Sequence, residues 1–592
     1  MEPKASDRLN AYLLSLFGSR PEDWSVVKES LHEVLHKIKT DSGGQVAKLT
    51  AAQVETAIAA IQASARGVDQ ISNAKVIDVI SAYDQPRFHY DTVKKIWFEV
   101  KADRSKFGVA EEKADMQRSR YSMLLQRIQR LPAFQPQKAV AAASSSMEEE
   151  TPPLCTIESL MGQSQCTTNH KTAMRAGVTS ASHSPRPHSL VMLIASLFCA
   201  LARLLSPPPP LSAPPAGKKV IFGQLCQLTE GVYSLEDIHS HIRLDLSGDV
   251  VLSSGLFTEG CLVLVEGEVT ESGAFKAATL IQPPAEPRLT TLKTFTALDW
   301  LGSDLSAGTK VDPEKLLKIQ LLRSPHHKGD MVVILSDVYL DQPDTLRRLG
   351  IMFGGYVDLG PRAFVFMGNF CSTALSSRPG EMDKMKAWFN GLADLIGKFP
   401  ALARESQFVF IPGPRDVPMS LGNCLPCPPL PSILTGRLRE KLTHVTFGSN
   451  PCRLSWIHKE LLFFREDLLH KLRRNCIRPP SEAETIDASQ HLVKTVLDQG
   501  HLCPLPLDKR PIYWNVDHAL RLYPLPDLLV LADVVDPYGW PYSGVEAANP
   551  GSFASDGQFM VYYPGRDTGA TPRTAEEKER EPIIEFCNLK GK

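Results

Sequence analysis

Residues 331–341 read MVVILSDVYLD, an apolar run with a polar end. Two runs of the same kind follow, AFVFMGNF at 363–370 and QFVFIPGPRD at 407–416. The segments between them, TLRRLGIMFGGY and MDKMKAWFNGLADLIGKF, have the spacing of amphipathic helices. Apolar strands that alternate with helices indicate an α/β domain with largely buried strands. We therefore expect such a domain over residues 286–565.

Each of these three strands ends in a short polar cluster, and ligands of open α/β sheets bind just beyond the carboxyl ends of strands. The clusters are Ser336-Asp337-Val338-Tyr339, Gly368-Asn369-Phe370 and Gly413-Pro414-Arg415-Asp416. Their order and spacing resemble the signature of calcineurin-like phosphoesterases, Asp-x-His, Gly-Asp, Gly-Asn-His-Asp/Glu and Gly-His-x-His. That resemblance implies a two-metal site, in which the metals activate a water for attack on phosphorus.

Position by position, the ligands of such a site are missing from this sequence. Asp337 matches the first Asp, but the His expected two residues later is Tyr339, whose phenol has an ordinary pKa of about 10. Asn369 stands where the bridging carboxylate belongs, and a neutral amide supplies no charge to hold two dications. Pro414 and Arg415 replace the metal-binding Asn and the adjacent His. We therefore expect these positions to be degenerate.

The remaining ligand motifs are equally incomplete. Gln499-Gly500-His501 keeps one Gly-His, so only Asp337 and His501 remain of the set, and two ligands do not retain two metals. Cys424 and Cys427 have Cys-x-x-Cys spacing without a second pair. No phosphate-binding glycine loop of the G-x-x-x-x-G-K-[ST] type occurs. The prediction is a protein without a catalytic, metal or cofactor site.

The region before the α/β domain divides by composition. Residues 1–80 have helical periodicity, and residues 81–165 read as a connector with an extended or hairpin segment near Tyr83, a charged helix over 110–130 and a linker. Residues 166–217 are a low-complexity insertion, predicted to be disordered or an artefact of the gene model such as a retained intron. Its apolar run over 190–205 is too short for a membrane span. Residues 566–592 form a C-terminal tail.

Residues 218–285 change to a strand-like period, with five short strands separated by turn residues. That number of strands in a short segment predicts an OB-fold barrel, a fold that binds single strands when aromatic side chains line a positive groove. The aromatic candidates are Phe222, Tyr233, Phe257 and Phe275. Few basic residues lie among them, which favours a protein-docking barrel, with binding of single-stranded DNA as the alternative.

Longer strings carry a more specific resemblance. LSDVYLDQ at 335–342, FREDLLHKLRRNCIRPP at 464–480 and PIYWNVDHALRLYPLPDLLVLAD at 511–533 resemble the B-subunit family of DNA polymerase epsilon. The resemblance covers about residues 1–165 and 218–565, and the insertion at 166–217 departs from it. It implies an α+β multidomain protein with an N-terminal helical domain like the lid of AAA+ ATPases, an OB-fold barrel and an inactive calcineurin-like phosphoesterase domain.

The same resemblance implies the function and the partners. The expected role is that of a non-catalytic accessory subunit of DNA polymerase epsilon in DNA replication. The expected partners are the C-terminal zinc-binding region of the catalytic subunit, the GINS component of the replicative helicase, and the small histone-fold subunits. The expected location is the nucleus. A net charge of -1 provides no overall positive field, so DNA contact is expected to be mostly indirect, and no membrane partner is expected. An active metal-dependent phosphoesterase or nuclease is the second alternative.

Overall fold

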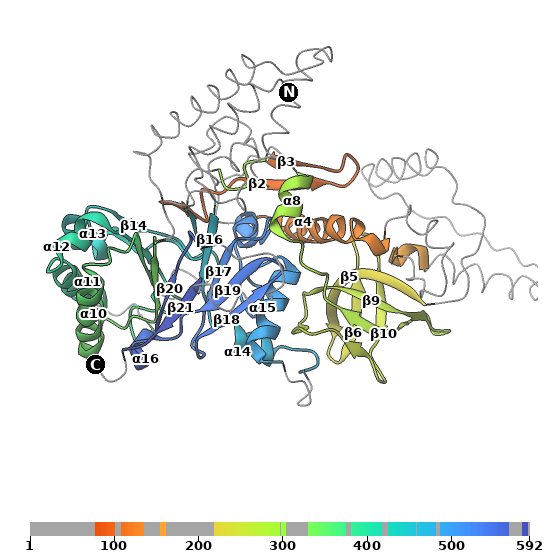
Figure 1. Ribbon diagram of the computed structural model, residues 1–592. Helices are drawn as coiled ribbons and strands as arrows, with labels where there is room; N and C mark the ends of the chain where they lie inside the picture. Colours follow the sequence, from red (N-terminus) through yellow and green to blue (C-terminus); the bar gives the residue numbers. More distant parts are fainter. Residues whose placement is uncertain are drawn as a thin grey trace, which may run out of the picture. The chain divides into compact units, whose positions relative to one another are not determined.

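The computed structural model describes residues 77–100, 108–134, 154–160, 218–295, 298–302, 329–374, 380–416, 424–456, 459–480, 486–566 and 583–589 (Figure 1). The predictions for the N-terminal helical domain and for the insertion at 166–217 lie outside these residues, apart from the last four positions of the former. The described residues fall into two compact units, Arg120–Pro284 and the combination of Met1–Ser119 with Ala285–Lys592.

The second unit contains two six-stranded sheets. The first has the order β14 (Val445–Phe447), β13 (Gln407–Ile411), β12 (Ala363–Met367), β11 (Val332–Ser336), β20 (Phe559–Tyr562) and β21 (Ile584–Cys587). Its first four strands run parallel, whereas β20 is antiparallel to both β11 and β21. The strands predicted from the three apolar runs are therefore neighbours at the centre of this sheet.

Helices cover the outer face of the first sheet. They are α10 (Pro343–Tyr356), α11 (Glu381–Ile396), α12 (Pro400–Glu405), α13 (Ser432–Lys441) and the short α16 (Phe553–Asp556), and Figure 1 shows α10 to α13 gathered on one side of it. Val333 and Leu335 of β11 point into this helix-covered core, which also contains Phe353 of α10 and Phe389 of α11. The helices predicted after the first two strands are confirmed by α10 and α11.

The second sheet has the order β1 (Ile77–Ser81), β15 (Cys452–Trp456), β16 (Lys459–Arg465), β17 (Leu528–Ala532), β19 (Val545–Asn549) and β18 (Tyr538–Tyr542). Val332 and Ile334, which alternate with the helix-facing residues of β11, pack in one buried cluster with Leu454 and Phe463 of this sheet. The two sheets therefore form a sandwich. Most strands of the second sheet come from residues after position 450, which the three apolar runs do not include.

Several shorter elements complete this unit. They are the hairpin β2 (Arg87–Asp91) and β3 (Ile96–Val100), α8 (Arg288–Thr294), α14 (Leu468–Arg474), α15 (Ala488–Gln499) and the 3-10 helix η7 (Trp514–Leu520). The hairpin expected near Tyr83 is confirmed by β2 and β3. Two edge strands come from outside the expected 286–565 segment, since β1 begins at Ile77 and β21 lies within the expected tail.

The first unit contains a closed barrel. Its strands are β5 (Lys219–Thr229), β6 (Val232–Glu236), β7 (His241–Asp245), β10 (Phe275–Ile281) and β9 (Leu262–Val269), and β9 pairs back with β5. The two-residue strands β4 (Leu154–Cys155) and β8 (Val251–Leu252) extend this sheet. The expected five-stranded barrel is confirmed. The boundary between the two units falls within α4 (Ala110–Gln129), the predicted charged helix, which precedes η3 (Pro132–Phe134).

No helix within the described ranges combines the length and the apolar character needed to cross a lipid bilayer.

Candidate functional site

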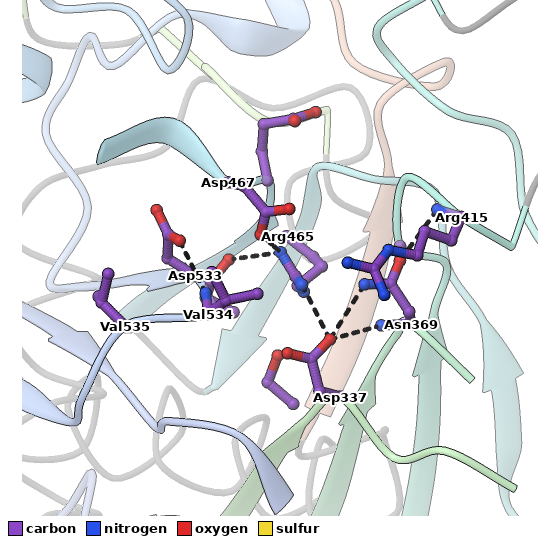
Figure 2. A network of polar contacts seen from close by, with 12 residues as sticks. Asp337, Asn369, Arg415, Arg465, Asp467, Asp533, Val534 and Val535 are labelled. Carbon is purple, nitrogen blue, oxygen red and sulfur yellow. Dashed lines mark hydrogen bonds and ion pairs between the residues drawn. The ribbon is translucent and has the colours of Figure 1, made fainter. Parts of the chain in front are cut away.

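Polar side chains from both sheets of the sandwich meet at the ends of the strands (Figure 2). Asp337 follows β11, Asn369 follows β12 and Arg415 follows β13. From the second sheet, Arg465 is the last residue of β16 and Asp533 follows β17. The carboxyl ends of the parallel strands thus bring together residues that are as many as 196 positions apart.

Arg465 lies at the centre of this network. Its Nη2 donates to Asp337 Oδ1 at 2.8 Å, and both side chains are fully buried. Its Nη1 donates to Asp467 Oδ1 at 2.6 Å and to the carbonyl oxygen of Ala532 at 3.3 Å. Burial alone would lower the pKa of Arg465, but the charges of Asp337 and Asp467 raise it above its ordinary value. A permanent cation therefore neutralises the carboxylate at the first strand end.

Asn369 joins Asp337 to the third strand end. Its backbone N–H and its Nδ2 donate to Asp337 Oδ1 at 3.2 and 3.0 Å, and its Oδ1 accepts from the backbone N–H of Arg415 at 2.9 Å. A carboxylate at position 369 would place a second negative charge 3.0 Å from Asp337. Arg465 already forms ion pairs with both Asp337 and Asp467, so an amide fits this position where a two-metal site would need an acid.

The other predicted positions lie on the rim of the network or away from it. The Nη1 of Arg415 donates to the carbonyl oxygen of Ser372 at 2.9 Å, and Pro414 precedes it in a half-buried turn. Burial, followed by the charge of Asp337, raises the pKa of Tyr339. A phenol whose pKa is raised stays protonated at neutral pH, which makes it a still poorer metal ligand.

His501 does not belong to this network in the described contacts. It follows α15, its Nδ1 accepts from the backbone N–H of Cys503 at 3.0 Å, and its Nε2 contacts Asp517 Oδ1 at 3.2 Å. Because Nδ1 accepts, Nε2 carries the proton and donates to the carboxylate. The Gly-His match at 500–501 therefore reflects a histidine that is hydrogen-bonded to the neighbouring Cys503 and to Asp517 of η7.

The donor set does not fit the two metals that the phosphoesterase resemblance implies. Among the described residues, no group of three or more His, Cys, Asp or Glu side chains is arranged to hold a metal ion. Asp337 Oδ2 is buried without a hydrogen-bond partner, but a single free oxygen beside a guanidinium makes no metal site. The described side chains at this edge form a cluster of hydrogen bonds and ion pairs whose donors do not fit a two-metal centre.

Similarity to known proteins agrees with the sequence-based resemblance. The family model for the B subunits of DNA polymerases alpha and epsilon matches residues 332–539. The B subunit of DNA polymerase epsilon from Arabidopsis thaliana is 34% identical over 83% of this chain and 82% of its own length. A DNA polymerase epsilon subunit 2 of Mus musculus is 34% identical over 92% of both chains.

The chain belongs to the B-subunit family of DNA polymerase epsilon. A second family model, the OB-fold domain of DNA polymerase epsilon subunit 2-like proteins, matches residues 204–284 and contains the closed barrel. A solved archaeal phosphodiesterase covers 44% of the chain at 12% identity with a TM-score of 0.22, a likeness too low to bear on the fold.

Within this family member, the sequence-based reasoning missed Arg465, Asp467 and Asp533. Arg465 and Asp467 lie in REDL directly after the apolar run KELLFF, and Asp533 directly follows LLVLA. Polar residues at the carboxyl ends of strands are the signal that identifies them, and this signal is present after β16 and β17 as it is after the first three strands.

Asp416 gives this edge of the B-subunit sandwich a pH dependence. Its carboxylate accepts from the backbone N–H groups of Phe370 at 2.7 Å and Gly413 at 2.8 Å. Burial raises the pKa of Asp416 from 3.8 to about 7. The folded chain therefore holds a proton that the unfolded chain releases between these two values. The contribution of Asp416 to the free energy of unfolding is fully present below about pH 4 and is lost as the pH rises through about 7.

We expect the free energy of unfolding, measured by urea denaturation, to fall less steeply between about pH 5 and about pH 8 in an Asp416→Asn variant than in the unmodified chain. Asp394→Asn, at an exposed carboxylate of α11, is the control and should leave the slope unchanged. An identical slope in both variants would contradict the raised pKa.

Proposed function

We propose that this chain is the non-catalytic B subunit of DNA polymerase epsilon and acts in chromosomal DNA replication in the nucleus. The proposal that the subunit is non-catalytic rests on the buried ion pair between Arg465 and Asp337, whose Nη2 and Oδ1 atoms are 2.8 Å apart. This pair places a fixed positive charge on the carboxylate that would be the first metal ligand in an active calcineurin-like phosphoesterase. The sandwich, whose strands lie mainly within residues 286–565, is then an inactive phosphoesterase domain, with Tyr339, Asn369, Pro414 and Arg415 in degenerate positions.

The barrel and the sandwich serve, in this proposal, to hold the C-terminal zinc-binding region of the catalytic subunit. The N-terminal region links the polymerase to the GINS component of the replicative helicase, and the small histone-fold subunits are part of the same assembly. Membership of the B-subunit family supports this arrangement. DNA is reached mainly through the partners.

Binding of single-stranded DNA by the barrel is less well supported. Phe222, Phe257 and Phe275 are buried in the barrel, and only Tyr233 of the four aromatic candidates is half-buried. Residues 218–285 contain nine Asp or Glu against four Lys or Arg. Bases stack on exposed rings in a positive groove, and this barrel offers neither feature to a strand.

A truncation of the N-terminal region tests separately the proposed binding to the catalytic subunit and the proposed binding to GINS. The cut belongs after residue 76 and not after residue 80, because β1 starts at Ile77 and pairs with β15 from Ile77↔Trp456 to Ser81↔Cys452. We expect tagged full-length chain to recover the catalytic polymerase subunit and GINS from nuclear extract, as identified by mass spectrometry. The chain that begins at Ile77 should keep the polymerase and lose GINS.

Failure of the full-length chain to recover a polymerase polypeptide would contradict the proposed function. A manganese-stimulated nuclease activity of the purified chain that is abolished by Asp337→Ala would instead support the phosphoesterase alternative.

A further inference from the structure

A small pocket lies beside the β2–β3 hairpin, in the same unit as the sandwich. Its lining includes Gln85, Phe88, Trp300, Arg453, His518 and Tyr523. The cavity is about 20 Å³, room for about one water-sized group and far too small for a base or a sugar. The pocket therefore selects for one small functional group of a larger ligand.

Three hydrogen-bond donors around this pocket have no partner among the described residues. They are Gln85 Nε2, Arg453 Nε and Trp300 Nε1, all buried atoms. Gln85 and Arg453 are only 8% and 4% exposed, so solvent does not satisfy them freely. A buried donor left without a partner costs about 1–3 kcal/mol, so an acceptor that enters this pocket would meet three lining residues that each carry such a donor.

The charges of the pocket favour an acceptor with negative charge. Arg453 and Arg521 both line it, against the single carboxylate of Glu460. That carboxylate is already engaged, since it forms ion pairs with Arg453 and, at 2.6 Å, with Arg288. Two guanidinium groups and one carboxylate leave the lining with one positive charge in excess, which suits a carboxylate better than an uncharged amide.

The walls of the pocket are aromatic. Trp300 packs edge to face against Trp97 and tilted against Phe88, with ring centroids 5.2 Å apart in each pair. Tyr523 stacks on Trp97 with a centroid distance of 5.4 Å and an interplanar angle of 28°. A rigid aromatic wall next to a carboxylate site offers apolar contact to the atoms that flank the carboxylate.

We propose that this pocket receives one carboxylate oxygen of an Asp or Glu side chain on a partner polypeptide, with an apolar neighbouring side chain packed against Trp300 and Tyr523. A free small anion would use the donors but not the aromatic wall, and a nucleotide would not enter the cavity. This inference goes beyond the proposed accessory role and does not depend on it, because it rests on the pocket alone.

The test uses the full chain and a set of fluorescein-labelled tripeptide amides, with Asp or Glu at the centre and Phe, Leu or Pro on each side. Matched peptides carry Asn or Gln at the centre, and acetate serves as the free anion. Fluorescence anisotropy should detect binding of acidic peptides, with the Asn and Gln peptides about tenfold weaker or more, because one charged hydrogen bond is lost.

Two variants test the pocket. Trp300→Phe removes the indole N–H together with the five-membered ring, and Gln85→Leu removes the amide at similar volume, so each should weaken the acidic peptides about tenfold. Trp388→Phe, at a partly buried indole that packs against the helix-covered core, is the matched control and should leave the affinity unchanged.

Stability measurements separate binding from a structural role. Since the Gln85 amide nitrogen has no partner, Gln85→Leu should leave the melting temperature unchanged or raise it while it lowers the affinity. A lower melting temperature with unchanged affinity would overturn the proposal. The same holds if no acidic peptide binds below about 1 mM, or if acetate or the Asn peptides bind as well as the acidic ones.

Discussion

Replacing Arg465 with methionine is expected to lower the free energy of unfolding by about 3–5 kcal/mol. Methionine fills much of the same space, so the loss comes chiefly from charge. Asp337 is fully buried and would keep only the amide donors of Asn369, the backbone N–H at 3.2 Å and Nδ2 at 3.0 Å. A buried carboxylate without its cation is among the most costly defects that a single substitution produces. Urea denaturation of the full chain measures the difference.

Two further variants show whether the loss belongs to the buried pair. Arg437→Met removes an ion pair to Asp394 of 2.6 Å, but both side chains are more than 40% exposed, so its cost should stay below about 1 kcal/mol. Combining Arg465→Met with Asp337→Asn removes both charges of the buried pair and should recover part of the loss. Asparagine tolerates the positive φ of 54° at position 337. Equal losses in the two arginine variants would show that Arg465 does not neutralise a buried charge.

Gly368→Ala should be the second most damaging substitution, with a loss of about 3 kcal/mol or more in the free energy of unfolding. A Cβ at this position would lie well under 3.0 Å from Asp416 Oδ2 and from the backbone nitrogen of Gly413. Neither atom can give way easily, because the carboxylate of Asp416 accepts hydrogen bonds from the N–H groups of Gly413 and Phe370. The strand ends that carry the network would have to separate.

The matched control is Gly436→Ala in α13, where a Cβ would meet no atom within 4 Å. Alanine is the better helix former, so this variant should gain about 0.5–1 kcal/mol. Thermal or urea unfolding should therefore move in opposite directions for the two Gly→Ala variants. A loss in both would mean that the effect of Gly368→Ala is not a steric one.

The sequence alone predicts the parts of the fold that depend on local pattern. The apolar runs that became β11, β12 and β13 have a buried-strand pattern, and the helices α10 and α11 between them have a helical one. The barrel follows from short strands at regular spacing. These features are set by residues near one another in the chain, so one sequence is enough to find them.

The pairing of the two sheets is not predictable in this way. Asp337 and Arg465 are 128 positions apart, and nothing local to either residue shows that β11 and β16 belong to facing sheets. The edge strands β1 and β21 likewise depend on contacts with distant strands. The Gly-His match at 500–501 is a local signal, but it does not identify the role of His501. A two-residue match is too short to distinguish a metal ligand from a histidine that is hydrogen-bonded to Asp517.

The cation of this polar network, the guanidinium of Arg465, is covalently part of the chain. A guanidinium cannot be chelated, exchanged for a competing ion or diluted away, so the two sheets remain joined at this edge whatever the cellular supply of zinc, manganese or magnesium. Introducing a carboxylate at position 369 or a histidine at position 339 would each leave the guanidinium of Arg465 in place beside Asp337.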